Sequence, residues 1–183
     1  MQRLMTIPGR RALVTVALAS LAATVAMWLL LRGPERVMQS RGYGIVPYEL
    51  AFSAQRAGAI LDTWGSAGRE AARQSLWMDF GFMPAYGVFF ASLTLLITRA
   101  QRRWWQRVGL GLVAAPLAAM LLDGLENLML LAILDAAGAV PPAPVLVAGV
   151  AATLKFTLLG LAVLYWLAGG TAWALRRATP GGS

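Results

Sequence analysis

The chain has 183 residues, of which 58% are hydrophobic and 13% charged, whereas soluble domains carry about 25% charged residues. This composition excludes an ordinary soluble protein and predicts a polytopic membrane protein with room for a single helical bundle. The formal net charge of +8 comes from arginines that flank the apolar segments. Because such arginines are attracted to anionic lipid, we expect membrane lipids and no nucleic acid as partners.

The absence of cysteine and histidine narrows the chemistry further. It excludes a disulfide framework, thiolate or imidazole metal sites and a histidine ligand to haem. No phosphate-binding glycine loop or nucleophile elbow is found either. We therefore expect neither a metal nor a cofactor, and any acid-base chemistry has to use carboxylates, tyrosines or the single lysine, Lys155.

Four apolar segments predict membrane-spanning helices. The first, residues 12–31, is uncharged and matches the roughly 30 Å of a bilayer's hydrocarbon core. Because it is longer than the apolar region of a signal peptide, we expect an uncleaved anchor. The other segments are residues 77–98, 110–134 and 144–168. The predicted fold class is all-α, a four-transmembrane-helix bundle in one domain covering residues 1–183, with a disordered tail at 179–183.

The distribution of basic residues predicts the orientation of this bundle. The stretches before the first segment, between the second and third, and after the fourth contain arginines and no acid, whereas the connection near Asp135 contains no base. The positive-inside rule then places both termini in the cytoplasm, and we expect a bacterial-type inner membrane. The arginines concerned are Arg3, Arg10, Arg11, Arg99, Arg102, Arg103, Arg107, Arg176 and Arg177.

The connection at residues 32–76 is patterned like a helix. Starting from Pro47, apolar residues recur at helical spacing, and Gly65 is placed to end the helix before a second one runs into the next span. The pattern predicts an amphipathic helix over the outer face of the bundle, either a lid or an interfacial anchor, or else a packing element that only covers helix ends. The stripe consists of Leu50, Ala54, Ala57, Leu61 and Trp64.

The third segment holds the densest polar group. Spacings of three and four put Asp123, Glu126 and Asn127 on one helical face. Pro116 lies on the same face and is expected to kink the helix, because proline cannot donate the backbone hydrogen bond and clashes with the preceding turn.

Lys155 lies within the fourth segment, where a charged side chain costs about 2.5–3.5 kcal/mol unless it faces a partner or water. Small residues share its face, which favours an orientation toward neighbouring helices. Glu126 and Asp123 lie about 12 and 16 Å from one end of their span, and Lys155 about 16 Å from the matching end of the next. We therefore expect these three side chains to share a level in the bundle.

These positions predict an outward-opening polar pocket. Asp79, Asp123, Glu126 and Lys155 are its candidate acid-base residues. At least one of these carboxyl groups is expected to be protonated, because three acids face a single lysine in an apolar setting. The candidate ligand-binding residues are Tyr86 and Asn127, together with two charged residues of the connection, Glu49 and Arg56.

Three functions fit this pocket. The first is binding or acid-base conversion of an amphipathic small molecule or lipid. The second is the role of an accessory subunit of a larger membrane complex, and the third is proton-coupled transport. Transport is disfavoured because the two halves show no inverted repeat. An ion-pair network that only fixes helix register is the structural alternative. Protein subunits or a second copy of the chain are candidate partners.

Overall fold

A computed structural model describes residues 2–178, so the predicted tail lies outside the described residues. The predicted fold class is confirmed: the protein is all-helical, and four helical regions are long and apolar enough to cross a membrane. Its elements are η1 (Gln2–Met5), α1 (Arg10–Gln39), α2 (Ile45–Glu49), α3 (Ala54–Arg99), α4 (Arg103–Leu112), α5 (Ala115–Asp135) and α6 (Pro142–Ala178).

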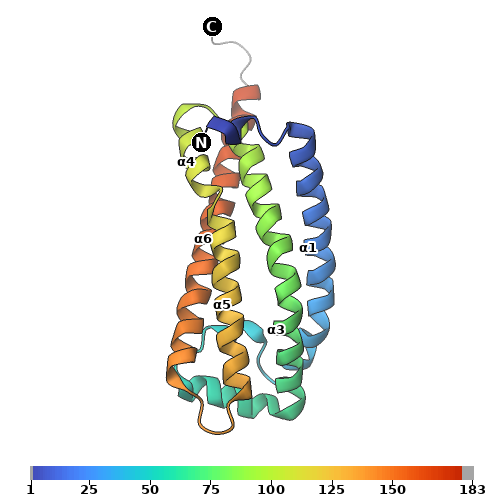
Figure 1. The fold of residues 1–183 in the computed structure, drawn as a ribbon, viewed down its shortest axis with the longest axis vertical. Helices are drawn as coiled ribbons and strands as arrows, with labels where there is room; N and C mark the ends of the chain where they lie inside the picture. The colour runs from blue at the N-terminus through green and yellow to red at the C-terminus, as the bar shows by residue number, and fades with distance from the viewer. Residues whose placement is uncertain (1, 179–183) are drawn as a thin grey trace.

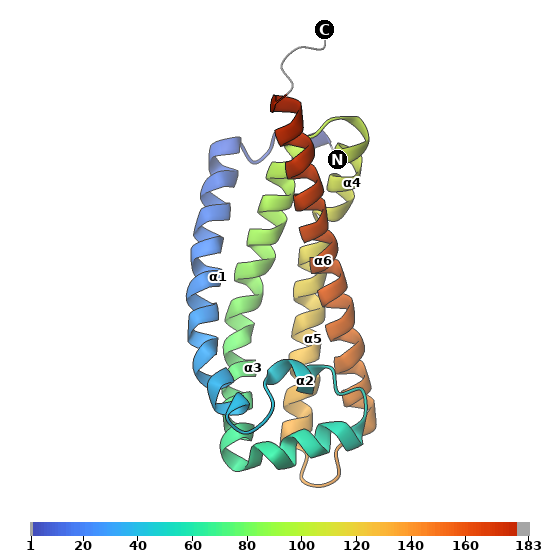
Figure 2. The same ribbon diagram turned by 180° about the vertical axis from the view of Figure 1, so that it is seen from behind.

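The long helices run side by side (Figure 1). α3 lies at the centre, where it packs on α1 and α5, while α5 packs along α6. α1 packs chiefly on α3 and makes no extensive contact with α6 among the described residues. η1 and the C-terminal part of α6 lie at one end of the bundle, and α2 lies at the opposite end (Figures 1 and 2). The side of the membrane that each end faces stays a prediction.

α1 extends beyond the predicted segment. The helix continues through Gly33 and Pro34 to Gln39 rather than ending near residue 31. Pro34 is buried and Met38 is fully buried in the core, and the Gln39 amide donates to Glu35 at 2.7 Å one turn away. Because tertiary burial and this side-chain bond stabilise the extra turns, they outweigh the helix-breaking preference of Gly-Pro.

The predicted continuous helix from Pro47 to Trp64 is wrong. α2 ends at Glu49, and α3 begins only after Ser53, whose Oγ accepts a hydrogen bond from the backbone N–H of Arg56 at 3.2 Å. Phe52 between them has φ of 56°, a left-handed conformation that interrupts a helix. The serine cap therefore starts a new helix, and the break allows α2 to turn into the bundle.

Gly65 ends the first part of α3, as predicted. Its φ of 59° and ψ of −164° are non-helical, in a region of backbone space that favours glycine. We call residues 54–64 the α3 arm and residues 66–99 the α3 stem. The arm lies across the end of the bundle, and the stem runs up into the second span (Figure 2).

A buried tryptophan fastens the arm to α2. Trp64 is fully buried and meets the Tyr48 ring edge-on at 5.1 Å. Its Nε1 donates to the Tyr43 carbonyl at 2.7 Å, and the Tyr48 hydroxyl donates to the Leu130 carbonyl of α5 at 3.2 Å. The predicted helix over the bundle end is thus an integral part of the core rather than a loosely held surface element.

The kink predicted at Pro116 takes the form of a division into two helices. α4 ends at Leu112 and α5 begins at Ala115, with Pro116 in its first turn. Proline is tolerated in the first turn because the N–H that it lacks has no helical partner there. α5 then carries the predicted polar face toward α3 and α6.

Candidate functional site

The polar face of α5 is buried as its spacing predicts. Asp123, Glu126 and Asn127 are 3%, 0% and 1% exposed, respectively. On the opposite side of the helix, Leu125 and Leu128 are exposed. The hydrophobic side of this span therefore faces outward, and its charged side faces the other helices.

Lys155 meets this face at the same level, as expected from the positions of the three residues along their spans. Its Nζ lies 2.5 Å from Asp123 Oδ1 and 2.8 Å from Glu126 Oε2. The lysine is 6% exposed, and its helical face is built of buried alanines. These small side chains bring α6 close to α5 and leave room for the long lysine side chain. The alanines are Ala148, Ala151, Ala152 and Ala162.

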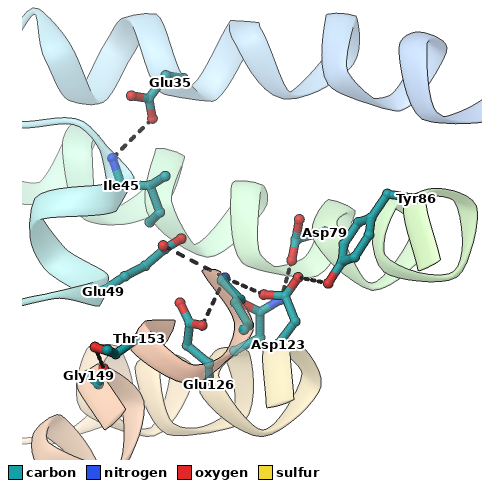
Figure 3. Close-up of polar contacts among 11 residues, drawn as sticks. Glu35, Ile45, Glu49, Asp79, Tyr86, Asp123, Glu126, Gly149 and Thr153 are labelled. Carbon is teal, nitrogen blue, oxygen red and sulfur yellow. Dashed lines mark hydrogen bonds and ion pairs between the residues drawn. The ribbon is translucent and has the colours of Figure 1, made fainter. Parts of the chain in front are cut away.

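Glu49 joins the cluster from α2. Its Oε2 lies 3.8 Å from Lys155 Nζ, and Figure 3 shows its side chain pointing toward Asp123 and Glu126. Glu35 of α1 holds this helix in place, because its carboxylate accepts a hydrogen bond from the Ile45 N–H at 3.1 Å. Burial raises the pKa of Glu49, and the nearby Lys155 ammonium partly offsets that rise.

The α3 stem supplies the remaining polar partners. The Tyr86 hydroxyl donates to Asp123 Oδ2 at 2.7 Å, and Asn127 Nδ2 donates to Asp79 Oδ2 at 2.7 Å (Figure 3). Asp123 is therefore held from two sides, by Tyr86 and by Lys155. We call the set Glu49, Asp79, Tyr86, Asp123, Glu126, Asn127 and Lys155 the polar cluster.

Arg56 is the one predicted site residue that lies apart. Its side chain is exposed on the α3 arm, and it is not among the residues that line the cavity described below. The helix break after Glu49 explains the separation, since it turns α2 into the bundle and leaves the arm across its end.

The polar cluster has more acceptors than donors. Glu49 Oε2 and both carboxylate oxygens of Glu126 are buried without a hydrogen-bond partner in the described part of the chain. Glu126 Oε2 does lie within ion-pair distance of Lys155, but outside hydrogen-bonding geometry. Unpaired buried acceptors are costly, so the cluster suits an added proton or an added donor group.

A cavity of about 500 Å³ opens beside the polar cluster, a size typical of small-molecule sites. Its walls are mainly apolar and come from all the long helices and from α2. Glu49, Tyr86, Asp123 and Lys155 face it, whereas Asp79, Glu126 and Asn127 do not line it. The other lining residues include Thr24, Trp28, Arg32, Phe82, Phe90, Phe156 and Leu159.

Sequence reasoning missed the α1 wall of this cavity. Thr24, Trp28 and Arg32 recur every four residues and therefore share one face of α1. The Arg32 guanidinium stacks on the Trp28 ring at 4.6 Å. That tryptophan–arginine spacing was the available signal, although it also fits an ordinary span end near the membrane interface.

An aromatic layer separates the polar cluster from a second polar group nearer the opposite end. Tyr86, Phe90 and Thr94 follow one another at four-residue spacing on α3, and Phe90 packs on Trp166 at 4.5 Å. Beyond this layer the Thr98 and Tyr165 hydroxyls lie 3.1 Å apart. Because rings interrupt the chain of polar groups, the arrangement gives no support to a proton relay through the bundle.

No protein-family model, curated protein or solved structure matches this chain. The fold and the site nevertheless define a class: an all-helical protein with four membrane-length helices and a buried lysine–carboxylate cluster.

The raised pKa of Glu49 predicts a pH-dependent stability difference for Glu49→Gln. Below the ordinary carboxyl range Glu49 is protonated in both the folded and the unfolded chain, and the amide is a close mimic. As pH rises through the raised folded-state pKa, the wild type loses stability that the variant keeps. Thermal unfolding in detergent at about pH 5 and about pH 8 should show the variant gaining on the wild type at the higher pH.

The charged groups around Glu49 are Asp123, Glu126, Lys155 and Glu35. The same pair of measurements on Glu70→Gln provides the control, because Glu70 is not one of these groups. Glu70 is exposed and pairs weakly with Arg73 at 3.7 Å. A stability difference between variant and wild type that is unchanged from about pH 5 to about pH 8, or that shifts in favour of the wild type, would contradict the prediction and make Glu49 a purely stabilising ion-pair partner.

Proposed function

We propose that this protein binds an amphipathic molecule in the cavity beside the polar cluster. The observation that carries the proposal is an apolar cavity of about 500 Å³ that is lined by Glu49, a buried acidic residue whose Oε2 has no hydrogen-bond partner among the described residues. A pocket with mainly apolar walls and a few convergent polar groups is the usual form of a ligand site.

The helix arrangement supports entry from the membrane. α1 and α6 both line the cavity, but they make no extensive contact with each other in the described part of the chain. α1 is also exposed along most of its length. The ligand's apolar part would pass between these two helices, so that it need not cross water or unfold the arm.

The polar cluster can also support acid-base conversion of the ligand. A carboxylic acid kept neutral by burial can donate a proton, and an ionised neighbour can accept one. Glu49, Asp123 and Lys155 reach the cavity and are the candidates for direct contact. Asp79, Glu126 and Asn127 lie behind them and would act by positioning and by tuning charge.

Filling the cavity should weaken binding strongly. Thr24 lines the α1 wall, so Thr24→Trp places a large ring in the space that the ligand would use. Native mass spectrometry of the protein extracted in its own lipid should find a bound amphiphile on the wild type and at least about tenfold less on the variant, since overpacking a site costs about 1–3 kcal/mol. The matched control is Val25→Trp, because Val25 is 46% exposed and does not line the cavity.

Two outcomes would contradict the proposal. One is retention of the same amphiphile by the wild type and Thr24→Trp. The other is an empty cavity in a protein that carries stoichiometric protein partners, which would favour the accessory-subunit interpretation.

A further inference from the structure

We propose that the polar group of the ligand is a protonated amine and that Glu49 is the residue that receives it. This inference rests on the proposed amphiphile site and names the chemistry of that site. It begins from Glu49, which lines the cavity, is 7% exposed and carries a fully buried oxygen, Oε2, that lacks a hydrogen-bond partner in the described chain. A ligand that pairs with the carboxyl group of Glu49 at the cavity wall has to bring a donor.

The charge of the polar cluster selects a cationic donor. Three carboxyl groups, from Glu49, Asp123 and Glu126, surround the single ammonium group of Lys155 within 3.8 Å. Asp79 adds a fourth acid nearby through Asn127. A second ammonium group would balance this excess, whereas a carboxylate or phosphate placed at the same point would increase the repulsion among buried anions.

The walls favour the same class of ligand. Aromatic rings attract cations through their faces, and the cavity is lined by Trp28, Phe82, Tyr86, Phe90 and Phe156. Lys155 Nζ already lies 5.0 Å from the centre of the Phe156 ring. An aliphatic amine can therefore place its chain along these rings and its ammonium group between them and Glu49.

Arg32 at the α1 wall distinguishes two sources of such an amine. Its side chain is exposed, stacks on Trp28 and makes no ion pair with a described residue. A phospholipid with a primary-amine headgroup carries a phosphate that Arg32 can bind. A free long-chain amine carries none and needs Glu49 alone.

The test compares three probes that share a twelve-carbon alkyl chain and differ in the polar group: dodecylamine, dodecanol and dodecanoate. Each labelled probe is titrated into the protein in phosphatidylcholine nanodiscs, and empty discs correct for partition into lipid. We expect dodecylamine to bind at least about tenfold more tightly than dodecanol, and dodecanoate to bind weakest. Glu49→Gln should weaken dodecylamine binding about 10- to 100-fold, the range of a charge-assisted hydrogen bond, and leave dodecanol nearly unchanged. Glu70→Gln, an exposed carboxylate outside the cavity, should change neither.

The outcomes separate the two proposals. Equal or tighter binding of dodecanol or dodecanoate overturns the amine inference and leaves an amphiphile site. Unchanged dodecylamine binding in Glu49→Gln overturns the assignment of Glu49. Absence of saturable binding by all three probes overturns both proposals. A variant that fails to fold is replaced by Glu49→Asp, which keeps the charge, shortens the reach and should weaken dodecylamine binding to an intermediate degree; full-strength binding by a folded Glu49→Asp would also overturn the assignment.

The source of the amine follows from a second titration with phosphatidylethanolamine added to the discs. Selective retention of this lipid, reduced by Arg32→Gln, supports the aminophospholipid, whereas dodecylamine binding without such retention supports a free amine. If neither dodecylamine nor phosphatidylethanolamine binds while dodecanol or dodecanoate does, the amine inference is overturned.

Discussion

Replacing Lys155 with methionine should destabilise the protein by about 3–5 kcal/mol, because removal of one partner leaves buried charges uncompensated. Lys155 is the only cation within ion-pair distance of Asp123, Glu126 and Glu49 in the described chain. Without it, the polar cluster has to take up protons or admit water. Thermal or denaturant unfolding in a mild detergent, followed by helical circular dichroism, measures the loss.

Leu154→Met is the matched control for this prediction, because it introduces the same side chain one residue away on an exposed face and should change stability little. Neutralising the partners should rescue the variant: Lys155→Met combined with Asp123→Asn and Glu126→Gln should recover a large part of the lost stability, since these residues act as one unit. A loss below about 1 kcal/mol for Lys155→Met would mean that the cluster is already hydrated or neutral.

The pattern across the polar cluster also separates a ligand site from a register device. A register device predicts that every charge-removing variant is less stable. A ligand site with excess acid predicts that Lys155→Met loses stability. It also predicts that Glu49→Gln keeps its stability but loses dodecylamine binding. Unfolding measurements on the two variants, made beside the binding titration, therefore test the function and the fold independently.

Trp64→Ala should cost about 3–5 kcal/mol, as expected for removal of a fully buried tryptophan. Trp64 packs against Tyr48 and hydrogen-bonds to the Tyr43 carbonyl, so its loss leaves a large cavity and an unpaired backbone carbonyl. Because Tyr48 and Glu49 are adjacent, we also expect weaker amphiphile binding. Unfolding experiments and the dodecylamine titration measure the two effects.

Trp77→Ala provides the control for this substitution, since Trp77 is 61% exposed and its loss should fall within the range of ordinary surface changes. Equal losses for Trp64→Ala and Trp77→Ala would contradict a core role for the α3 arm and would return it to the class of surface elements that merely cover helix ends.

Much of the bundle could be predicted because it depends on local periodicity. A span needs about twenty apolar residues, and a helix rises 1.5 Å per residue, so the membrane-length helices and the common level of Asp123, Glu126 and Lys155 were accessible without coordinates. The same periodicity placed Asn127 beside the acids and the buried alanines beside Lys155. Gly65 was identifiable because glycine tolerates backbone conformations that other residues avoid.

The parts that could not be predicted depend on contacts between distant segments. Glu49 and Arg56 were both candidate ligand-binding residues, but only Glu49 enters the polar cluster, because Ser53 and Phe52 interrupt the helix and because Glu35 holds the start of α2. Arg56, seven residues later, stays outside for the same reason. No periodic pattern in residues 45–56 contains that information.

The cavity is the clearest example of this division. The residue pattern of each helix decides which of its faces are apolar and which are charged, since side-chain direction follows from backbone period. The pattern does not decide which helix lies opposite each face. In the folded chain α1 packs on α3 and makes no extensive contact with α6 among the described residues. An acidic residue of α2 therefore lines an apolar cavity whose walls include both α1 and α6. Only packing of the whole chain sets that arrangement, because its energy comes from surfaces far apart in sequence.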